Sequence, residues 1–120
     1  MKSLLFICVV VFVAGFVRGE TEREACERLA PKYEALTEWM LPDRSRVDLL
    51  SEKIAWEVDW APKWAEGIGQ AIYYAAWTER AGGLILLVKD PEREKVYVLR
   101  AKLACAWAGL TLRVERSVEE

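Results

Sequence analysis

The hydrophobic and polar positions of the first half of this chain predict a helix followed by short strands. Between residues 22 and 36, apolar residues recur every three or four positions, which is the period of one helix face. Extended patterns follow at residues 37–41, 46–50 and 54–60, and turn-forming residues separate them. We expect these three strands to form an antiparallel meander, because the connections between them are short.

The second half of the chain alternates helices with apolar strands. A helix is expected from residue 61 to about residue 80, and the Ala-Gly-Gly run at 81–83 is expected to end it. The continuous apolar run at 84–88 is typical of a central strand covered on both faces. A further helix and an alternating strand follow at residues 92–107 and 110–116. The order α-β-β-β-α-β-α-β predicts an α/β domain with a mixed central sheet flanked by helices.

Residues 1–19 have the pattern of a secretory signal peptide. Lys2 precedes an unbroken apolar run of 14 residues at 4–17. This run is shorter than the roughly 17–25 residues that span a bilayer. We therefore predict an exported protein, periplasmic or secreted, in which residues 20–120 form a single domain without a stable membrane partner. Arg18 is unusual beside a cleavage site, so an uncleaved N-terminal membrane anchor remains the alternative.

Composition narrows the chemistry that this domain can perform. Residues 20–120 carry 15 Lys plus Arg against 19 Asp plus Glu, and a net charge of −4 disfavours strong non-specific binding to nucleic acid. The chain has no histidine, which excludes imidazole-based catalysis and histidine-ligated zinc. Cys26 and Cys105 are either two buried thiols or a disulfide between the first and last helices.

Acidic residues on neighbouring strands form the main candidate site. Because side chains alternate along a strand, Glu57 and Asp59 project from the same face. If the strands at 46–50 and 54–60 pair through their short turn, Asp48 lies beside Glu57. Like charges in a half-buried place repel one another, and a hard cation with oxygen ligands offsets that repulsion. Mg²⁺ or Mn²⁺ is therefore the predicted cofactor; the alternative is that these acids lie on a solvated sheet face.

The helix predicted after residue 60 carries a second set of residues on one face. Lys63, Gly67, Gln70 and Tyr74 are spaced by four, three and four positions. A glycine inside a helix costs about 1 kcal/mol relative to alanine and often allows a ligand or another backbone to approach closely. We expect Gly69, like Gly67, to allow such a close approach. The alternative is ordinary packing of this helix against the sheet.

Four motifs in this region resemble the core of the PD-(D/E)xK nuclease superfamily. They are RVD at 46–48, WEVD at 56–59, KWAE at 63–66 and GQAIYY at 69–74. Together they are most similar to small exported bacterial members, and the resemblance covers about residues 37–90. It implies a restriction-endonuclease-like fold and metal-dependent cleavage of phosphodiester bonds in DNA outside the cytoplasm.

The resemblance also implies roles for individual residues. Asp48 and Glu57 would be metal ligands, with the Val58 carbonyl as a third oxygen. The superfamily has a lysine where Asp59 stands here. Lys63 would then reach back from the start of the helix to replace that lysine, or Asp59 would bind a second metal.

Three more residues would contact the substrate under this resemblance. Gln70 and Tyr74 match a Q-x-x-x-Y motif that lies near the substrate strand in related nucleases, and Arg46 lies in the first motif. A different class of function remains open, namely a catalytically inactive interaction module of the cell envelope with the same fold. Asp59 in place of lysine, the negative net charge and the six tryptophans favour that alternative.

Overall fold

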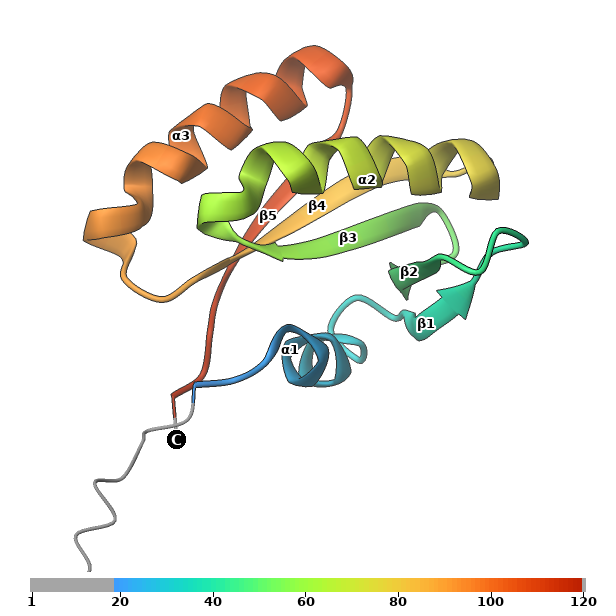
Figure 1. Ribbon diagram of the computed structural model, residues 1–120, viewed down its shortest axis with the longest axis horizontal. Coiled ribbons are helices and arrows are strands. Elements are labelled where there is room, and N and C mark those ends of the chain that lie inside the picture. The colour runs from blue at the N-terminus through green and yellow to red at the C-terminus, as the bar shows by residue number, and fades with distance from the viewer. Residues whose placement is uncertain (1–18, 120) are drawn as a thin grey trace, which may run out of the picture.

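A computed structural model describes residues 19–119, which form one five-stranded mixed sheet with helices on both faces (Figure 1). The predicted α/β class and the element order α-β-β-β-α-β-α-β are confirmed. The predicted signal peptide lies outside the described residues, apart from Gly19. No helix in residues 19–119 is long and apolar enough to cross a bilayer. In chain order the elements are α1 (Glu22–Leu29), β1 (Leu36–Met40), β2 (Arg46–Leu50), β3 (Ile54–Trp60), the 3-10 turn η1 (Ala61–Lys63), α2 (Trp64–Thr78), β4 (Ala81–Val88), α3 (Pro91–Ala108) and β5 (Thr111–Arg116).

The sheet has the strand order β1-β2-β3-β4-β5 and combines two kinds of pairing. β1, β2 and β3 pair antiparallel, which confirms the predicted meander. β4 lies parallel to both β3 and β5, and α2 and α3 make the two crossovers. The β3–β4 ladder runs from Ile54↔Ala81 to Trp60↔Leu87. In contrast, β2 pairs with β3 in the described ladder at Leu49↔Trp56 and Leu50↔Ala55 only.

β4 lies in the middle of the core and is buried on both of its faces. Leu84 and Leu86 pack in a cluster with Ala101 and Cys105 of α3. Ile85 and Leu87 pack in a second cluster with residues of α1. Figure 1 shows α2 and α3 on one side of the sheet and α1 on the other. The continuous apolar run of this strand is therefore explained by helices on both sides.

The first helix is shorter than its periodicity predicts. It ends at Leu29, and the chain turns through residues 30–34 before β1 begins. Pro31 explains this end, because proline has no N–H to donate and its ring clashes with the preceding turn of a helix. Glu34 then takes a left-handed backbone with φ 49°, which redirects the chain toward β1.

The boundary between α2 and β4 also differs from the prediction. The helix ends at Thr78, and Glu79 is its left-handed C-cap with φ 53°. Residues 81–83 belong to the strand instead of ending the helix. Gly83 is required there, because an added Cβ would lie 2.3 Å from Cε3 of the buried Trp56 ring. These glycines therefore make room between strands and the side chains that cover them.

Cys26 and Cys105 are free, buried thiols, so the disulfide alternative is wrong in this structure. Cys26 of α1 packs against one side of the sheet, and Cys105 of α3 packs against the other side. Burial raises the pKa of both thiols, which keeps them in the unreactive protonated form.

Candidate metal centre

Asp48 of β2 and Glu57 of β3 lie together, as the strand pairing predicts. They follow the Leu49↔Trp56 pair in register, at the point where the β2–β3 ladder stops. Beyond that point the Asp48 carboxylate takes the place of a backbone partner, and its Oδ2 accepts a hydrogen bond of 2.8 Å from the Val58 N–H. The regular backbone pairing of β2 with β3 therefore stops at Asp48, and the side chain of Asp48 supplies the next hydrogen bond between the two strands.

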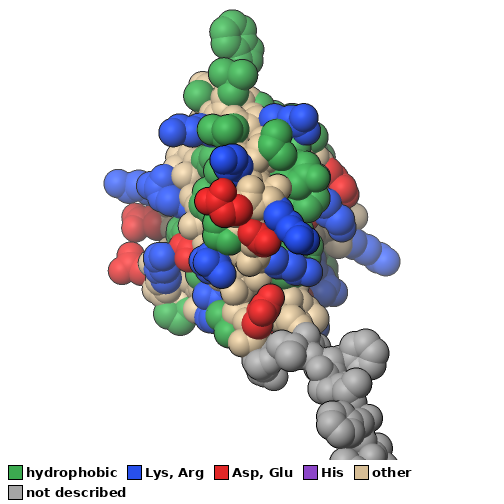
Figure 2. Space-filling view, turned by 90° about the vertical axis from the view of Figure 1, so that its left-hand side faces the viewer, with side chains coloured by type: hydrophobic (Ala, Val, Ile, Leu, Met, Phe, Trp, Pro, Cys, Tyr) green, Lys and Arg blue, Asp and Glu red, His purple; other side chains and the backbone are tan. Residues whose placement is uncertain are grey.

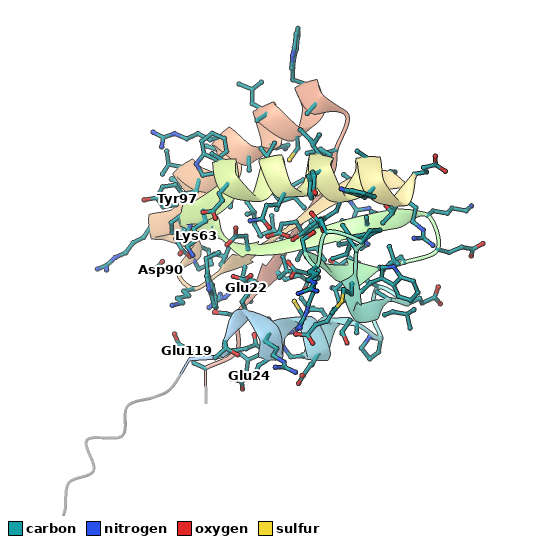
Figure 3. All side chains as sticks on the ribbon, turned by 45° about the vertical axis from the view of Figure 1, so that its right-hand side comes forward. Glu22, Glu24, Lys63, Asp90, Tyr97 and Glu119 are labelled. Atoms are coloured by element: carbon teal, nitrogen blue, oxygen red, sulfur yellow. The ribbon has the colours of Figure 1, made fainter. Side chains whose placement is uncertain are left out.

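Glu22 is the third carboxylate of this site, and the sequence analysis does not identify it. One ligand oxygen from each of Glu22, Asp48 and Glu57 lies within 4.8 Å of the others. Thr21 caps α1 by accepting a 3.1 Å hydrogen bond from the Glu24 N–H, which places Glu22 at the first helical position. Figure 3 shows Glu22 on the sheet side of α1 and Glu24 on its outer side. Acidic residues are common in the first turn of any helix, so no local pattern marks Glu22 as a ligand.

Glu57 is the buried member of this cluster, whereas Glu22 and Asp48 are partly buried. Glu57 is 3% exposed, and its Oε2 has no hydrogen-bond partner among the residues described. Burial, together with the nearby Asp48, raises the pKa of Glu57 to about 11. Burial also raises the pKa of Asp48, although hydrogen bonds from Glu57 and the Val58 N–H oppose the change. At neutral pH the pair therefore holds a proton when no cation is bound.

Glu22 responds to the same surroundings. Burial first, and then the charges of Asp59 and Asp48, raise its pKa to about 7. Asp59 itself is 4% exposed, so the alternative of acids on a solvated sheet face is wrong for Glu57 and Asp59 alike. A bound cation would favour ionisation of the whole cluster.

The donors present fit a small divalent cation. Octahedral Mg²⁺ holds oxygen ligands at about 2.1 Å, which puts adjacent ligands about 3 Å apart and opposite ligands about 4.2 Å apart. The separations within the cluster, all below 4.8 Å, are close to this range. A bound cation would take Glu57 Oε2 as a ligand and so give this oxygen, which has no hydrogen-bond partner among the described residues, the partner that buried polar atoms normally have. Carboxylate oxygens suit Mg²⁺ or Mn²⁺ better than softer metals.

A pocket lies beside this cluster, and four of its five lining residues carry charged side chains. Glu38 of β1 has a left-handed backbone with φ 49°, and it interrupts the β1–β2 ladder between Thr37↔Leu49 and Trp39↔Val47. Its carboxylate lies 3.5 Å from Arg23 Nε and 3.8 Å from Arg46 Nη1. Arg46 therefore lies close to this pocket, through its contact with Glu38, and Arg23 lines the pocket although no pattern in the sequence marks it. The pocket is lined by Glu22, Arg23, Cys26, Glu38 and Asp48.

Asp59 lies outside the group of close carboxylates. Its Oδ1 accepts a 2.9 Å hydrogen bond from the Trp60 N–H, and its side chain faces α2. An added Cβ on Gly67 would lie 3.4 Å from Asp59 Cβ and 2.8 Å from Leu84 Cδ1, so this glycine allows α2 to approach the sheet. Gly69 differs from the expectation, because an added Cβ there would meet nothing within 4 Å.

Lys63 is an exposed cation at the start of α2. Figure 3 shows it on the same side of the molecule as Glu22. Burial raises the pKa of both Asp59 and Glu22, and the charge of Lys63 opposes part of that rise in each. Lys63 is therefore within electrostatic reach of the acidic cluster, although it forms no ion pair with these carboxylates among residues 19–119.

Gln70 and Tyr74 interact with each other on α2. The Tyr74 hydroxyl donates a 2.9 Å hydrogen bond to Gln70 Oε1. Tyr74 is buried beside Val47 and Ala55, so ordinary packing against the sheet describes this residue. Burial and the charges of Glu57 and Asp48 raise the pKa of its hydroxyl. A role of this pair in substrate binding remains a prediction.

The arrangement as a whole places oxygen ligands for a cation next to basic side chains. The three carboxylates supply oxygen ligands, while Arg23, Arg46 and Lys63 supply positive charge around them.

Comparisons with protein-family models, with curated proteins and with solved structures find no significant match to this chain.

Proposed function

We propose that this protein is a divalent-metal-dependent nuclease with a restriction-endonuclease-like core, which cleaves phosphodiester bonds in DNA outside the cytoplasm. One observation carries the proposal: the buried Glu57 Oε2, inside a cluster of close carboxylates, has no hydrogen-bond partner in the part of the chain that the structure describes. The position of Asp48 and Glu57 on adjacent strands of a meander also supports it, because the PD-(D/E)xK superfamily, which these motifs resemble, carries its metal ligands there.

In this proposal each residue has a distinct task. Glu22, Asp48 and Glu57 hold a Mg²⁺ or Mn²⁺ ion, which supplies Lewis-acid activation of the phosphate and a more acidic bound water. Arg23 and Arg46 bind the phosphate backbone at the mouth of the pocket. Lys63 offsets the negative charge that develops on the phosphate, in place of the lysine that Asp59 replaces.

A cleavage assay tests the proposal directly. Plasmid, duplex and single-stranded DNA are incubated with the wild type and with Asp48→Asn or Glu57→Gln, in Mg²⁺ or in Mn²⁺. We expect the wild type to cleave and both variants to lose activity. Glu52→Gln, an exposed change in the turn between β2 and β3, is the matched control and keeps full activity. Equal cleavage by all four proteins, or cleavage by none, would contradict the proposal.

Asp59 supports a second candidate, a metal-binding interaction module without catalysis. It occupies the lysine position of the motif, it is buried, and its side chain points toward α2. Calorimetric titration with Mn²⁺ separates the two candidates when it is combined with the cleavage assay. A site that needs Asp48 and Glu57, in a protein that cleaves none of the DNA substrates, favours the module.

A further inference from the structure

The outer side of α3 carries a line of exposed hydrophobic side chains. Their exposed fractions rise along the helix, from Val96 at 41% through Leu99 at 63% and Leu103 at 77% to Trp107 at 94%. They recur every three or four residues, so they form one stripe, which points away from the buried Ala101. Large apolar residues this exposed and this regularly placed mark an interaction site.

Basic side chains border this stripe on both sides. Arg93 and Arg100 are seven residues apart on one border, and Lys95 and Lys102 are seven residues apart on the other, which is close to two helical turns. All four are exposed. Figure 2 shows hydrophobic side chains in a line that reaches the top of the molecule, with Lys and Arg side chains to either side.

The ion pairs of these basic residues are weak. Arg93 lies 3.6 Å from Asp90, and Lys95 lies 3.9 Å from Glu92, both on the exposed surface. α3 carries four basic residues against two acidic ones, although the domain as a whole is negative. The positive charge is thus concentrated next to the apolar stripe.

We propose that α3 docks this protein onto an anionic phospholipid surface. A helix that lies in a membrane interface inserts an apolar stripe with Leu and Trp between the lipids, while flanking Lys and Arg contact the anionic headgroups. The stripe from Val96 to Trp107 is about 16 Å long, since each helical residue rises about 1.5 Å. Both parts of the surface, apolar and basic, find a partner in this environment.

A second copy of the chain fits this surface less well. Pairing of two α3 helices through the stripe would bring the basic borders of both copies together, in either the parallel or the antiparallel direction. Nucleic acid would attract the basic residues, but it would leave Leu99, Leu103 and Trp107 against phosphates. An anionic bilayer is therefore the favoured occupant.

This inference is independent of the nuclease proposal. α1, which carries Glu22, lies on the opposite side of the sheet from α3 (Figure 1). A membrane under α3 therefore leaves the acidic cluster uncovered.

Flotation with vesicles tests the docking. Protein produced from the full sequence is mixed with vesicles of phosphatidylcholine that contain about 30% phosphatidylglycerol, and with vesicles of phosphatidylcholine alone. Mass spectrometry verifies that wild type and variants begin at the same residue, so that the N-terminal segment contributes equally. We expect binding to the anionic vesicles to exceed binding to the neutral ones, and to fall as salt is added.

Two variants and their matched controls make the test specific to α3. Leu103→Glu, and the double change Lys95→Gln with Lys102→Gln, should each weaken binding by at least about tenfold. Leu36→Glu on β1 is the control for the first, and Lys53→Gln in the β2–β3 turn is the control for charge removal; both should bind like the wild type.

Three results would overturn the inference. The first is equal binding by the α3 variants and their controls. The second is a wild-type dimer in light scattering that Leu103→Glu dissociates, since the stripe would then be a dimer interface. The third is binding to duplex DNA that the Lys95 and Lys102 changes weaken, together with no binding to anionic vesicles. Melting curves by circular dichroism confirm that each variant is folded.

Discussion

Glu57→Gln replaces a buried, titratable carboxyl group with a side chain of the same size that cannot ionise, so it should change how stability depends on pH. The pKa of Glu57 rises from 4.5 to about 11 in the folded protein. A raised pKa means that the stabilising contribution is complete below about pH 4.5 and is lost as the pH increases toward 11. The unfolding free energy falls by about 1.36 kcal/mol for each pH unit in this range. Between about pH 5 and about pH 8 the protein therefore loses about 4 kcal/mol of stability. Glutamine does not ionise, so the variant avoids this loss.

The assay is chemical denaturation of wild type and Glu57→Gln at about pH 5 and about pH 8, with chelator present. We expect similar unfolding free energies at the lower pH, and a variant more stable by about 4 kcal/mol at the higher pH. Millimolar Mn²⁺ should restore the unfolding free energy of the wild type at the higher pH, because the cation offsets the charge of the ionised carboxylates. The unfolding free energy of the variant should stay nearly unchanged. Glu52→Gln, on the exposed turn, should follow the wild type throughout. A difference between wild type and Glu57→Gln that is the same at both pH values would refute the reasoning.

Three further changes test other parts of the structure. Gly83→Ala should lower the unfolding free energy by about 3 kcal/mol, measured by urea denaturation, because its Cβ would lie 2.3 Å from the Trp56 ring; an unchanged midpoint would show that the ring can move. Glu38→Gly should be more stable than Glu38→Ala by about 1 kcal/mol in the same measurement, since glycine adopts φ 49° without a steric penalty; equal stability would mean that the backbone relaxes. Lys63→Gln should keep Mn²⁺ affinity in calorimetry and reduce cleavage by about a hundredfold, whereas unchanged cleavage would exclude Lys63 from the reaction.

The fold could be predicted from the sequence in segments where the hydrophobic residues follow a single, regular spacing. The patterns of β3 and β4 predict both strands, and the structure confirms them. The burial of β4 follows from its continuous apolar run, whereas β3 is buried on both faces, including Glu57 and Asp59, which its alternation does not predict. The predicted helix boundaries are less accurate, because a single residue can determine where a helix ends. Pro31 stops α1 early, and Glu79 rather than a glycine takes the left-handed cap of α2.

The candidate site was only partly accessible. Asp48 and Glu57 could be placed together because a short turn fixes the pairing of β2 and β3. Glu22 could not, since it is distant in the chain and reaches the cluster through the packing of α1 on the sheet. The left-handed backbone of Glu38 and the nearness of Arg23 also depend on tertiary structure, which no local pattern encodes.

The early stop of the β2–β3 ladder has a consequence for local unfolding. β1 pairs with β2 alone in the described sheet, and the backbone pairing of β2 with β3 is confined to the end beside their turn, with the Asp48–Val58 hydrogen bond beyond it. The amides of the β1–β2 hairpin should therefore exchange with deuterated solvent at a lower free energy of opening than those of the long β3–β4 ladder. A cation that joins Asp48 to Glu57 would fasten the hairpin to the sheet, and occupancy of the centre would then be visible as slower exchange across β1 and β2.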